Sequence, residues 1–270
     1  MQKIVVTGAD GRMGRAILEA VFAMDGVELS GALVKRDSPY IGFDAGELIG
    51  RGKLGVSITD DVKSVLNSNV TVIDFTAPSA TLAHLAIAAQ VGCKMVIGTT
   101  GFSEQELEQL HHFGGNVSMV FAGNYSVGVN LSLQLLRLAS SILGNSSDVE
   151  IIEAHHKHKV DAPSGTALMM GHAVADGRGV QLNDVAVYSR EGITGAREEG
   201  AIGFSAIRGG DIVGEHTVMF ASEGERVEIT HKASSRQTFA RGAVRAAKWL
   251  REKREAGVFD MEDVLGFKRN

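Results

Sequence analysis

The pattern of apolar and polar positions changes once along the chain, near residue 126. Before that point, short apolar runs typical of buried strands alternate with segments whose apolar residues recur at helical spacing. Strands are expected at 4–7, 27–34, 70–75, 94–97 and 117–122, and helices at 12–24, at 78–89 and after a capping box formed by Ser103 and Glu106. This alternation predicts a parallel sheet covered by helices on both faces.

Beyond residue 126 the pattern predicts a second, different sheet. The expected elements are a helix marked by Leu131, Leu135, Leu138 and Ile142, strands at 149–154, 202–208, 212–221 and 226–232, and a closing helix at 236–254. The last three strands are separated by Gly209-Gly210 and Glu223-Gly224, turns short enough for antiparallel hairpins. We therefore predict an α/β protein with an N-terminal Rossmann-type, doubly wound parallel sheet. Its second domain is α+β, with a largely antiparallel or mixed sheet.

Composition narrows the classes of function. The chain has 270 residues and a formal net charge of −5, which disfavours a nucleic-acid binder that works by bulk electrostatics. Its single cysteine, Cys93, excludes an internal disulfide and is typical of a reducing cytosol. No secretory signal is expected, and no apolar run approaches the roughly 20 residues that span a bilayer. We expect a soluble, cytoplasmic protein without nucleic-acid or membrane partners.

A glycine-rich loop between the first strand and the first helix predicts a dinucleotide site. It reads Gly8-Ala9-Asp10-Gly11-Arg12-Met13-Gly14, a variant of the usual G-x-G-x-x-G spacing. Glycines let the backbone approach a pyrophosphate, and the helix N-terminus supplies free N–H donors. A purely structural turn is the alternative, but strand, loop and helix stand in the order that binding requires.

The end of the second strand bears on which dinucleotide is used. An NAD site usually places an acidic residue there to hold the ribose 2′-hydroxyl. This chain has Val34, followed by Lys35 and Arg36, and two cations without a carboxylate favour a 2′-phosphate. Asp37 can serve the ribose if the strand ends later, and an ordinary solvated charge pair is the alternative for the two cations.

Two further strand exits are rich in glycine. One is Gly98-Thr99-Thr100-Gly101 and the other is Ala122-Gly123-Asn124-Tyr125. Strand exits of open α/β sheets lie at the carboxyl edge, where ligands bind. Each can be mere turn chemistry, but three such exits on one edge favour a nicotinamide slot.

The most distinctive stretch runs from Glu153 to Thr166. At the end of a predicted strand it carries the cluster His155, His156, Lys157, His158 and Lys159. Such a cationic cluster can bind an anion, and histidine can exchange a proton near neutral pH. Gly165 and Thr166 then begin a helix whose N-terminal amides and threonine hydroxyl can hold a carboxylate.

A metal site and a solvated basic loop are the alternatives for this stretch. Adjacent histidines followed by lysines are poor zinc spacing, and no further cysteine or carboxylate ligand is evident. No metal ion is therefore expected. The solvated basic loop stays open on the local sequence alone.

The sequence resembles the 4-hydroxy-tetrahydrodipicolinate reductases, also called dihydrodipicolinate reductases, of the lysine and diaminopimelate pathway. The matching stretches are 8–14, 96–102, 153–166 and 208–216. They span nearly the whole chain in the family's order. The histidine–lysine stretch is highly specific, whereas the glycine loop alone is not.

The resemblance implies that NAD(P)H reduces a cyclic, imine-type dicarboxylate to tetrahydrodipicolinate. It makes His155 the principal acid or base and Lys159 a proton donor. It also implies that His156 contacts the substrate and that Gly165 and Thr166 hold one carboxylate. The cofactor-lining residues it implies are Gly8 through Met13, Gly98 through Thr100 and Ala122 through Tyr125.

Further expectations follow from the same resemblance. Many members carry a glutamate where this chain has Val34, so that Lys35 beside it favours NADPH, with NADH as the second cofactor. The family also implies a dinucleotide-binding domain split into 1–126 and 236–270. Residues 127–235 then form a substrate-binding and oligomerisation domain, whose sheets build a homotetramer.

Two other functions stay open at this point. One is another nicotinamide-dependent dehydrogenase of the aspartate pathway, acting on an acyclic substrate, which the histidine–lysine stretch disfavours. The other is a non-catalytic, dinucleotide-binding redox sensor. The sequence shows no DNA-binding helix pair or basic face that supports such a regulator.

Overall fold

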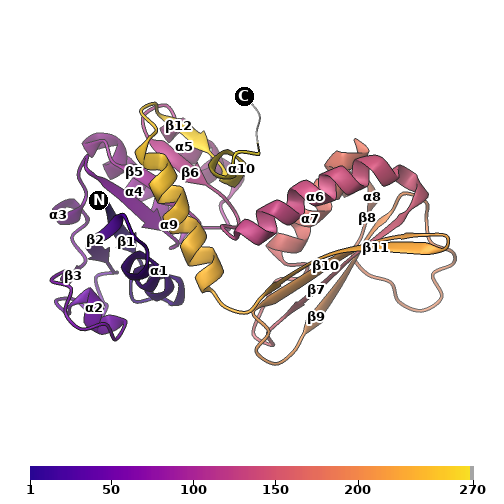
Figure 1. Ribbon diagram of the computed structural model, residues 1–270, viewed down its shortest axis with the longest axis horizontal. Coiled ribbons are helices and arrows are strands. Elements are labelled where there is room, and N and C mark those ends of the chain that lie inside the picture. Colours follow the sequence, from indigo (N-terminus) through magenta and orange to yellow (C-terminus); the bar gives the residue numbers. More distant parts are fainter. Residues whose placement is uncertain (268–270) are drawn as a thin grey trace. The chain divides into compact units, whose positions relative to one another are not determined.

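The computed structural model describes residues 1–267, and they form two compact units (Figure 1). The first unit combines Met1–Ser126 with the stretch that begins at Arg236, and the second is Val127–Ser235. Each unit has its own sheet and its own hydrophobic core, and each is described below by itself.

The first unit is built on a seven-stranded sheet in the order β12-β6-β5-β4-β1-β2-β3. Its strands are β1 (Gln2–Thr7), β2 (Val27–Leu33), β3 (Ile58–Thr59), β4 (Val70–Asp74), β5 (Lys94–Ile97), β6 (Ser118–Phe121) and β12 (Gly257–Phe259). All neighbouring pairs are parallel, which confirms the predicted sheet. The strand order reverses between β1 and β4, and ligands of such sheets bind at that reversal.

Helices cover both faces of this sheet. They are α1 (Arg12–Ala23), α2 (Ala45–Leu48), α3 (Val62–Val65), α4 (Pro78–Val91), α5 (Glu104–Phe113), α9 (Gln237–Arg251) and α10 (Met261–Leu265). On β1, Ile4 and Val6 join the core under α1 and α9, whereas Val5 joins the core under α4 and α5. Because successive side chains of a strand point to opposite faces of the sheet, β1 is buried on both faces. The capping box of Ser103 and Glu106 at the start of α5 is confirmed.

The last helices return to the first unit and are fixed there by close backbone contacts. A side chain at Gly242 of α9 would lie 1.8 Å from the carbonyl oxygen of Tyr125, so only glycine fits. At the other end of α9, the ammonium group of Lys94 donates to the carbonyl oxygens of Leu250, Arg251 and Lys253 at 2.6–3.1 Å. A cation at this helix end also complements the helix dipole.

The second unit contains a five-stranded mixed sheet in the order β11-β10-β7-β9-β8. Its elements are α6 (Val127–Leu143), the 3-10 turn η1 (Gly144–Ser146), β7 (Asp148–His155), α7 (Gly165–Arg178), α8 (Leu182–Val185), β8 (Ala186–Val187), β9 (Ile202–Arg208), β10 (Gly214–Ser222) and β11 (Glu225–Ala233). Helices α6 and α7 pack on one face over a core that includes Val149, Ile151, Val218 and Phe220.

One predicted hairpin is wrong. The turn at Gly209-Gly210 was expected to join two antiparallel neighbours, but β7 lies between β9 and β10, parallel to the first and antiparallel to the second. The connecting segment pairs instead with the chain after β7: Gly209 N donates to His155 O at 2.9 Å, and His156 N donates to Ile212 O at 2.8 Å. Only the turn at Glu223-Gly224 forms a hairpin, between β10 and β11.

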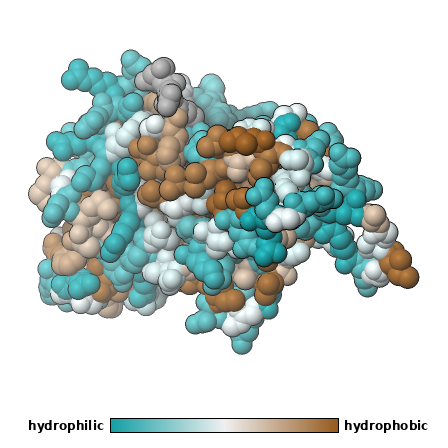
Figure 2. All heavy atoms as spheres, turned by 45° about the vertical axis from the view of Figure 1, so that its right-hand side comes forward, coloured by the Kyte–Doolittle hydropathy of each residue, from teal (hydrophilic) through white to brown (hydrophobic). Residues whose placement is uncertain are grey.

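The helix expected around Leu131 is present as α6, but its buried face is not the one that the leucines mark. Leu131, Leu135, Leu138 and Ile142 are all exposed, whereas Val129, Leu133 and Leu136 face the core. The brown areas of Figure 2 show that apolar side chains reach the surface. Among the described helices, Val127–Ser146 is long and apolar enough to cross a membrane by length and composition alone, features that core helices of soluble proteins share.

We predict that Gly242→Ala destabilises the first unit, although alanine is intrinsically the better helix former. The added methyl group collides with the Tyr125 carbonyl, and overpacking of this kind lowers the free energy of unfolding by about 1–3 kcal/mol. This loss exceeds the gain of about 1 kcal/mol that the higher helix propensity of alanine contributes. Urea unfolding measures the difference. The matched control is Arg241→Ala, at the exposed neighbouring position of the same helix, which should be near neutral. Equal stability of Gly242→Ala and wild type would contradict the packing described for α9.

Candidate active site

Strand β7 presents two polar residues where its inward face leaves the hydrophobic core. Alternate residues of the strand are buried: Val149 and Ile151 lie in the core, and Glu153 and His155 follow on the same face. The period of two therefore places a carboxylate and an imidazole side by side. The Nδ1 atom of His155 lies 2.6 Å from Oε2 of Glu153.

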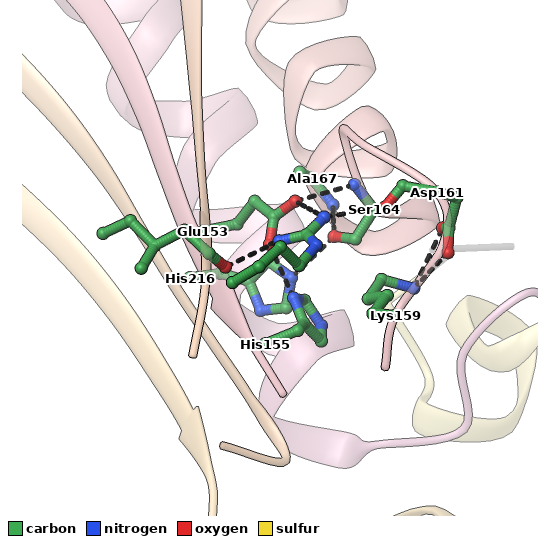
Figure 3. Close-up of polar contacts among 9 residues, drawn as sticks. Glu153, His155, Lys159, Asp161, Ser164, Ala167 and His216 are labelled. Atoms are coloured by element: carbon green, nitrogen blue, oxygen red, sulfur yellow. Dashed lines mark hydrogen bonds and ion pairs between the residues drawn. The ribbon is translucent and has the colours of Figure 1, made fainter. Parts of the chain in front are cut away.

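The Glu153 carboxylate is the centre of a buried polar network (Figure 3). It is 1% exposed, and Arg208 of β9 donates to both of its oxygens at 2.7 Å. The backbone N–H of Ser164, just before α7, donates to Oε1 at 3.1 Å. These donors and His155 hold the pKa of Glu153 below its usual range, although burial alone raises it. The group is therefore ionised and fully engaged.

The Glu153 carboxylate interacts with both Arg208 and His155, and this affects the protonation state of His155. Burial lowers the pKa of His155, and the nearby cations Lys159 and Arg208 lower it further, while the Glu153 carboxylate opposes them. The imidazole is therefore neutral at neutral pH. We assign its proton to Nδ1 from the contact with the carboxylate, which leaves Nε2 as the acceptor atom. A base oriented by a buried carboxylate is a common arrangement for proton transfer.

A second buried histidine supports the start of α7. His216 of β10 lies opposite Glu153 in the sheet, and its Nε2 atom is 3.0 Å from Oγ of Ser164. Its ring is perpendicular to that of His155 at a centroid distance of 5.0 Å. Burial, and then the neighbouring His155, lower the pKa of His216 to about 4, so this ring is neutral as well. Its Nδ1 atom is buried and has no hydrogen-bond partner among the described residues.

The N-terminus of α7 is held open towards a ligand. Ser164 caps the helix by accepting a hydrogen bond from Ala167 N at 3.2 Å. Gly165 is exposed, and a side chain added there would meet nothing within 4 Å, so its amide is accessible. Thr166 follows in the same turn. The N-terminal end of a 14-residue helix carries a partial positive charge and favours an anion such as a carboxylate.

The remaining predicted residues of this stretch differ in their surroundings. The ammonium of Lys159 donates to both carboxylate oxygens of Asp161, at 2.8 and 2.9 Å. His156 is partly buried, and its Nδ1 atom has no partner within the described residues. Lys157 and His158 are exposed. The structure thus brings His155 and the start of α7 to Glu153, and it pairs Lys159 with Asp161 (Figure 3). The alternative of a solvated basic loop fits only the exposed residues Lys157 and His158.

In the first unit, the glycine loop forms a close backbone turn at the end of β1. Gly8 has a φ of +60°, a conformation that favours glycine. A side chain at Gly14 would lie 2.0 Å from the carbonyl oxygen of Gly8, so α1 can approach the loop only because this residue is glycine. Gly11 is the N-cap residue of α1 and offers no side-chain cap, while its own N–H donates to Gly8 O at 2.9 Å. The N-terminus of α1, which begins at Arg12, favours an anion such as a pyrophosphate.

The other residues of the loop are arranged around it. Ala9 is buried, Arg12 is exposed, and Met13 packs against the core. Oγ of Ser38 donates to the carboxylate of Asp10 at 2.6 Å, and Arg15 donates to its carbonyl oxygen at 3.1 Å. The loop is held by its own contacts, which is what a preformed ligand site needs.

The predicted strand exits follow β5 and β6 at the same edge. Gly98 and Thr100 reach the surface, as do Ala122 and Gly123, while Thr99 and Asn124 are buried. Tyr125 is also buried, and its hydroxyl donates to the carbonyl oxygens of Ile97 and Val120 at 2.9 Å. Its ring is therefore part of the core, tilted against Phe75 at 5.4 Å, and does not itself present a surface.

The end of β2 differs from the expectation in one respect. Val34 is buried in the core, so its side chain does not face a ribose. Lys35 is exposed and pairs with Asp37 at 3.2 Å, whereas Arg36 lies 3.9 Å from Asp60. Both cations are thus close to carboxylates. Within residues 1–267, no group of three or more His, Cys, Asp or Glu side chains is placed to hold a metal ion.

Four residues of the Glu153 network were missed as site residues from the sequence: Glu153, Ser164, Arg208 and His216. The alternation of buried positions along β7 could have identified Glu153, because it continues the face of Ile151. Arg208 and His216 are brought in by strand register, with His155 opposite Arg208 and Glu153 opposite His216. No local pattern encodes that register.

Comparisons with known proteins bear on both units. The family model described as "Dihydrodipicolinate reductase, N-terminus" matches residues 2–125, and the model described as "Dihydrodipicolinate reductase, C-terminus" matches residues 128–265. A 4-hydroxy-tetrahydrodipicolinate reductase of Nitrosospira multiformis is 56% identical to this chain over 266 residues, which cover 98% of each.

Solved structures give the same result. A dipicolinate-bound dihydrodipicolinate reductase from Paenisporosarcina sp. TG-14 is 25% identical, with a TM-score of 0.75 over 96% of this chain and 97% of that one. An amine dehydrogenase from Mycobacterium smegmatis is 16% identical, with a TM-score of 0.59 over 95% and 94%. The second likeness shows the fold alone.

We predict that His216 makes the protein less stable in mild acid. Because its pKa falls from 6.5 to about 4 on folding, the unfolded chain takes up a proton between these values and the folded chain does not. The free energy of unfolding therefore falls by about 2 kcal/mol as the pH is lowered from 7 to 5. His216→Gln keeps a side chain that can hydrogen-bond Ser164 but does not titrate, so the stability of this variant should fall less over the same range. Urea unfolding at both pH values measures this; an identical decrease in the two proteins would contradict the assignment.

Proposed function

The chain belongs to the dihydrodipicolinate reductase family, and from that premise we propose how its two units reduce 4-hydroxy-tetrahydrodipicolinate to tetrahydrodipicolinate with NAD(P)H. The observation that carries the proposal is the network around Glu153, which holds a neutral His155 beside the open N-terminus of α7. A non-catalytic sensor needs no such network, and the family match leaves no support for a different aspartate-pathway dehydrogenase.

The first unit is the proposed dinucleotide site. Gly8 through Met13 form a turn that a side chain at Gly14 would block, and this cradle fits a pyrophosphate. Gly98, Thr99 and Thr100, with Ala122 through Tyr125, complete the edge; the buried ring of Tyr125 shapes the strand ends from inside. When bound, the reduced nicotinamide supplies a hydride to the substrate.

The second unit is the proposed substrate site. The substrate is a dicarboxylate, and one carboxylate is proposed to accept hydrogen bonds from the amides of Gly165 and Thr166 at the start of α7. His156 and the ammonium of Lys159 lie on the preceding loop and are proposed to contact the remaining polar groups. The same anion chemistry agrees with the relative solved with dipicolinate bound.

Proton transfer is assigned to the pair His155 and Lys159. Hydride addition to the substrate must be matched by a proton, and Lys159 carries one while paired with Asp161. His155 is neutral, and its Nε2 atom can accept or relay a proton without leaving the Glu153 carboxylate. Glu153 and Arg208 keep the ring in place throughout.

Two further properties are part of the proposal. We propose a homotetramer built from the sheets of the second unit, since Ile152 and Ile207 are exposed apolar residues on the sheet face opposite α6 and α7. We also propose a cytoplasmic location. The buried thiol of Cys93, whose pKa burial raises to about 11, needs no oxidising compartment.

We predict that His155→Ala and Lys159→Ala each lower kcat by about 10²–10⁴-fold, the usual contribution of a general acid or base. Affinity for NADPH should stay near that of wild type, because both residues belong to the second unit. An assay that follows NADPH oxidation with enzymatically generated substrate measures kcat, and His158→Ala is the control at an exposed histidine of the same loop. Near-normal kcat in both variants would refute the roles assigned to them.

The cofactor preference gives a second prediction: NADPH is used at least as well as NADH. Lys35 can attract a 2′-phosphate, but it is exposed and already paired with Asp37. Lys35→Ala should therefore lower kcat/KM for NADPH by no more than about tenfold and leave kcat/KM for NADH unchanged. Asp37→Ala removes the partner of Lys35 and should raise kcat/KM for NADPH but not for NADH. Measured kcat/KM for both cofactors at low and high salt separates the effects. A wild type that favours NADH tenfold, with a neutral Lys35→Ala, would exclude this role.

A further inference from the structure

The first unit contains a second fully buried carboxylate, at the point where β4 ends. Asp74 is 0% exposed, yet it lies beside the strand exits that are proposed to hold the dinucleotide. It belongs to neither the glycine loop nor the histidine–lysine stretch. A buried charge is costly unless donors satisfy it, so its retention at this edge points to a task.

Five donors surround the Asp74 carboxylate. Thr76 donates to Oδ1 through its backbone N–H at 3.0 Å and through its hydroxyl at 2.6 Å. Two more hydroxyls, from Thr81 of α4 and Thr99 after β5, lie 3.2 and 3.4 Å from the same oxygen. The other oxygen, Oδ2, is 2.6 Å from Nδ1 of His84 on α4. The carboxylate is therefore saturated with partners from three elements.

His84 balances the carboxylate within the core. Burial raises the pKa of Asp74, but the hydrogen bond and charge of His84, followed by the donors of Thr76, lower it below its usual range. Asp74 is therefore ionised. Only 14% of the His84 side chain is exposed, so the Asp74–His84 pair is shielded from solvent.

The Asp74 network joins the exits of β4 and β5 by hydrogen bonds and lies next to the exit of β1. The hydroxyl of Thr99 accepts a hydrogen bond from Thr76 N at 3.1 Å and lies 2.8 Å from the hydroxyl of Thr81. Gly98 N donates to the backbone oxygen of Asp74 at 2.8 Å. Thr76 also packs closely against the glycine loop: a Cβ atom added to Gly8 would lie 3.0 Å from the methyl group of Thr76. Hydrogen bonds of Asp74 thus join the exits of β4 and β5, and Thr76, which Asp74 holds, packs against the exit of β1 at Gly8.

We propose that the Asp74–His84 pair is a positioning device for the dinucleotide, acting through Thr76 and Thr99 on the backbone that cradles it. The proposal rests on the proposed function, because it assigns the pair to the cofactor side of that reaction. It touches neither substrate nor proton transfer. Loss of the pair therefore lowers the affinity for the cofactor and leaves kcat, measured at saturating cofactor, unchanged.

The test compares His84→Ala, which removes the donor, with His84→Asn, whose side-chain amide can donate from the position of Nδ1. His84→Ala should raise the Kd for NADPH about tenfold, the effect of losing one hydrogen bond to a charged group. His84→Asn should restore binding to within about threefold. Titration calorimetry with the full chain gives Kd, and steady-state kinetics should show a raised cofactor KM with kcat within twofold.

Two further variants separate positioning from stability. Thr81→Val removes a hydroxyl of the network on α4 without a change in volume, and should weaken NADPH in the same direction. His111→Ala, at an exposed histidine of α5 in the same unit, should bind like wild type. Thermal unfolding of each variant shows whether it is folded. Hydrogen exchange of the peptides around Thr76 and Thr99 should rise in His84→Ala even without cofactor.

The possible outcomes differ clearly. If the wild type binds neither NADPH nor NADH, the proposed function fails and this inference fails with it. If the wild type binds but folded His84→Ala and Thr81→Val bind equally well, only the inference is overturned. It is also overturned if His84→Asn is as weak as His84→Ala at equal thermal stability, because the pair then has no specific donor role.

Discussion

The ion pair between Glu153 and Arg208 is the interaction on which the candidate active site depends. A carboxylate that is 1% exposed stays ionised only because a guanidinium donates to both of its oxygens and Ser164 adds a backbone donor. Because Arg208 compensates its negative charge, the ionised Glu153 can orient His155 without forcing a second proton onto the ring. A neutral, oriented imidazole is what a proton relay requires.

The same pair is connected to the start of α7. Glu153 accepts a hydrogen bond from Ser164 N, and Ser164 caps α7, so hydrogen bonds join the carboxylate, His155 and the first turn of the helix. His216 supports the arrangement from β10 as a buried neutral ring. Removing Arg208 would therefore disturb not only one contact but also the position of His155 relative to the start of α7. The first unit contains a comparable buried carboxylate, since Asp74 joins the ends of β4 and β5 to α4.

Much of the fold follows from local patterns. Alternating strands and helices, with apolar runs of four to six residues, are enough to predict the parallel sheet, because a strand buried on both faces has no polar side. The glycine loop after β1 is equally local: its close approach to α1 needs glycine at Gly14. By contrast, the apolar stripe of Leu131, Leu135 and Leu138 is exposed on α6. Periodicity identifies a helix and its stripe but not which neighbour covers it.

The sequence by itself determined the class of the fold, the family, and the stretch that contains the proposed acid–base residues, because these depend on residue types at short spacing. Tertiary structure alone decided that β7 lies between β9 and β10, and so brought Arg208 and His216 to Glu153 from more than 50 residues away. It also decided that His155 is neutral and that Val34 is buried. Strand register and desolvation are properties of the whole packed unit, and no short window of sequence encodes them.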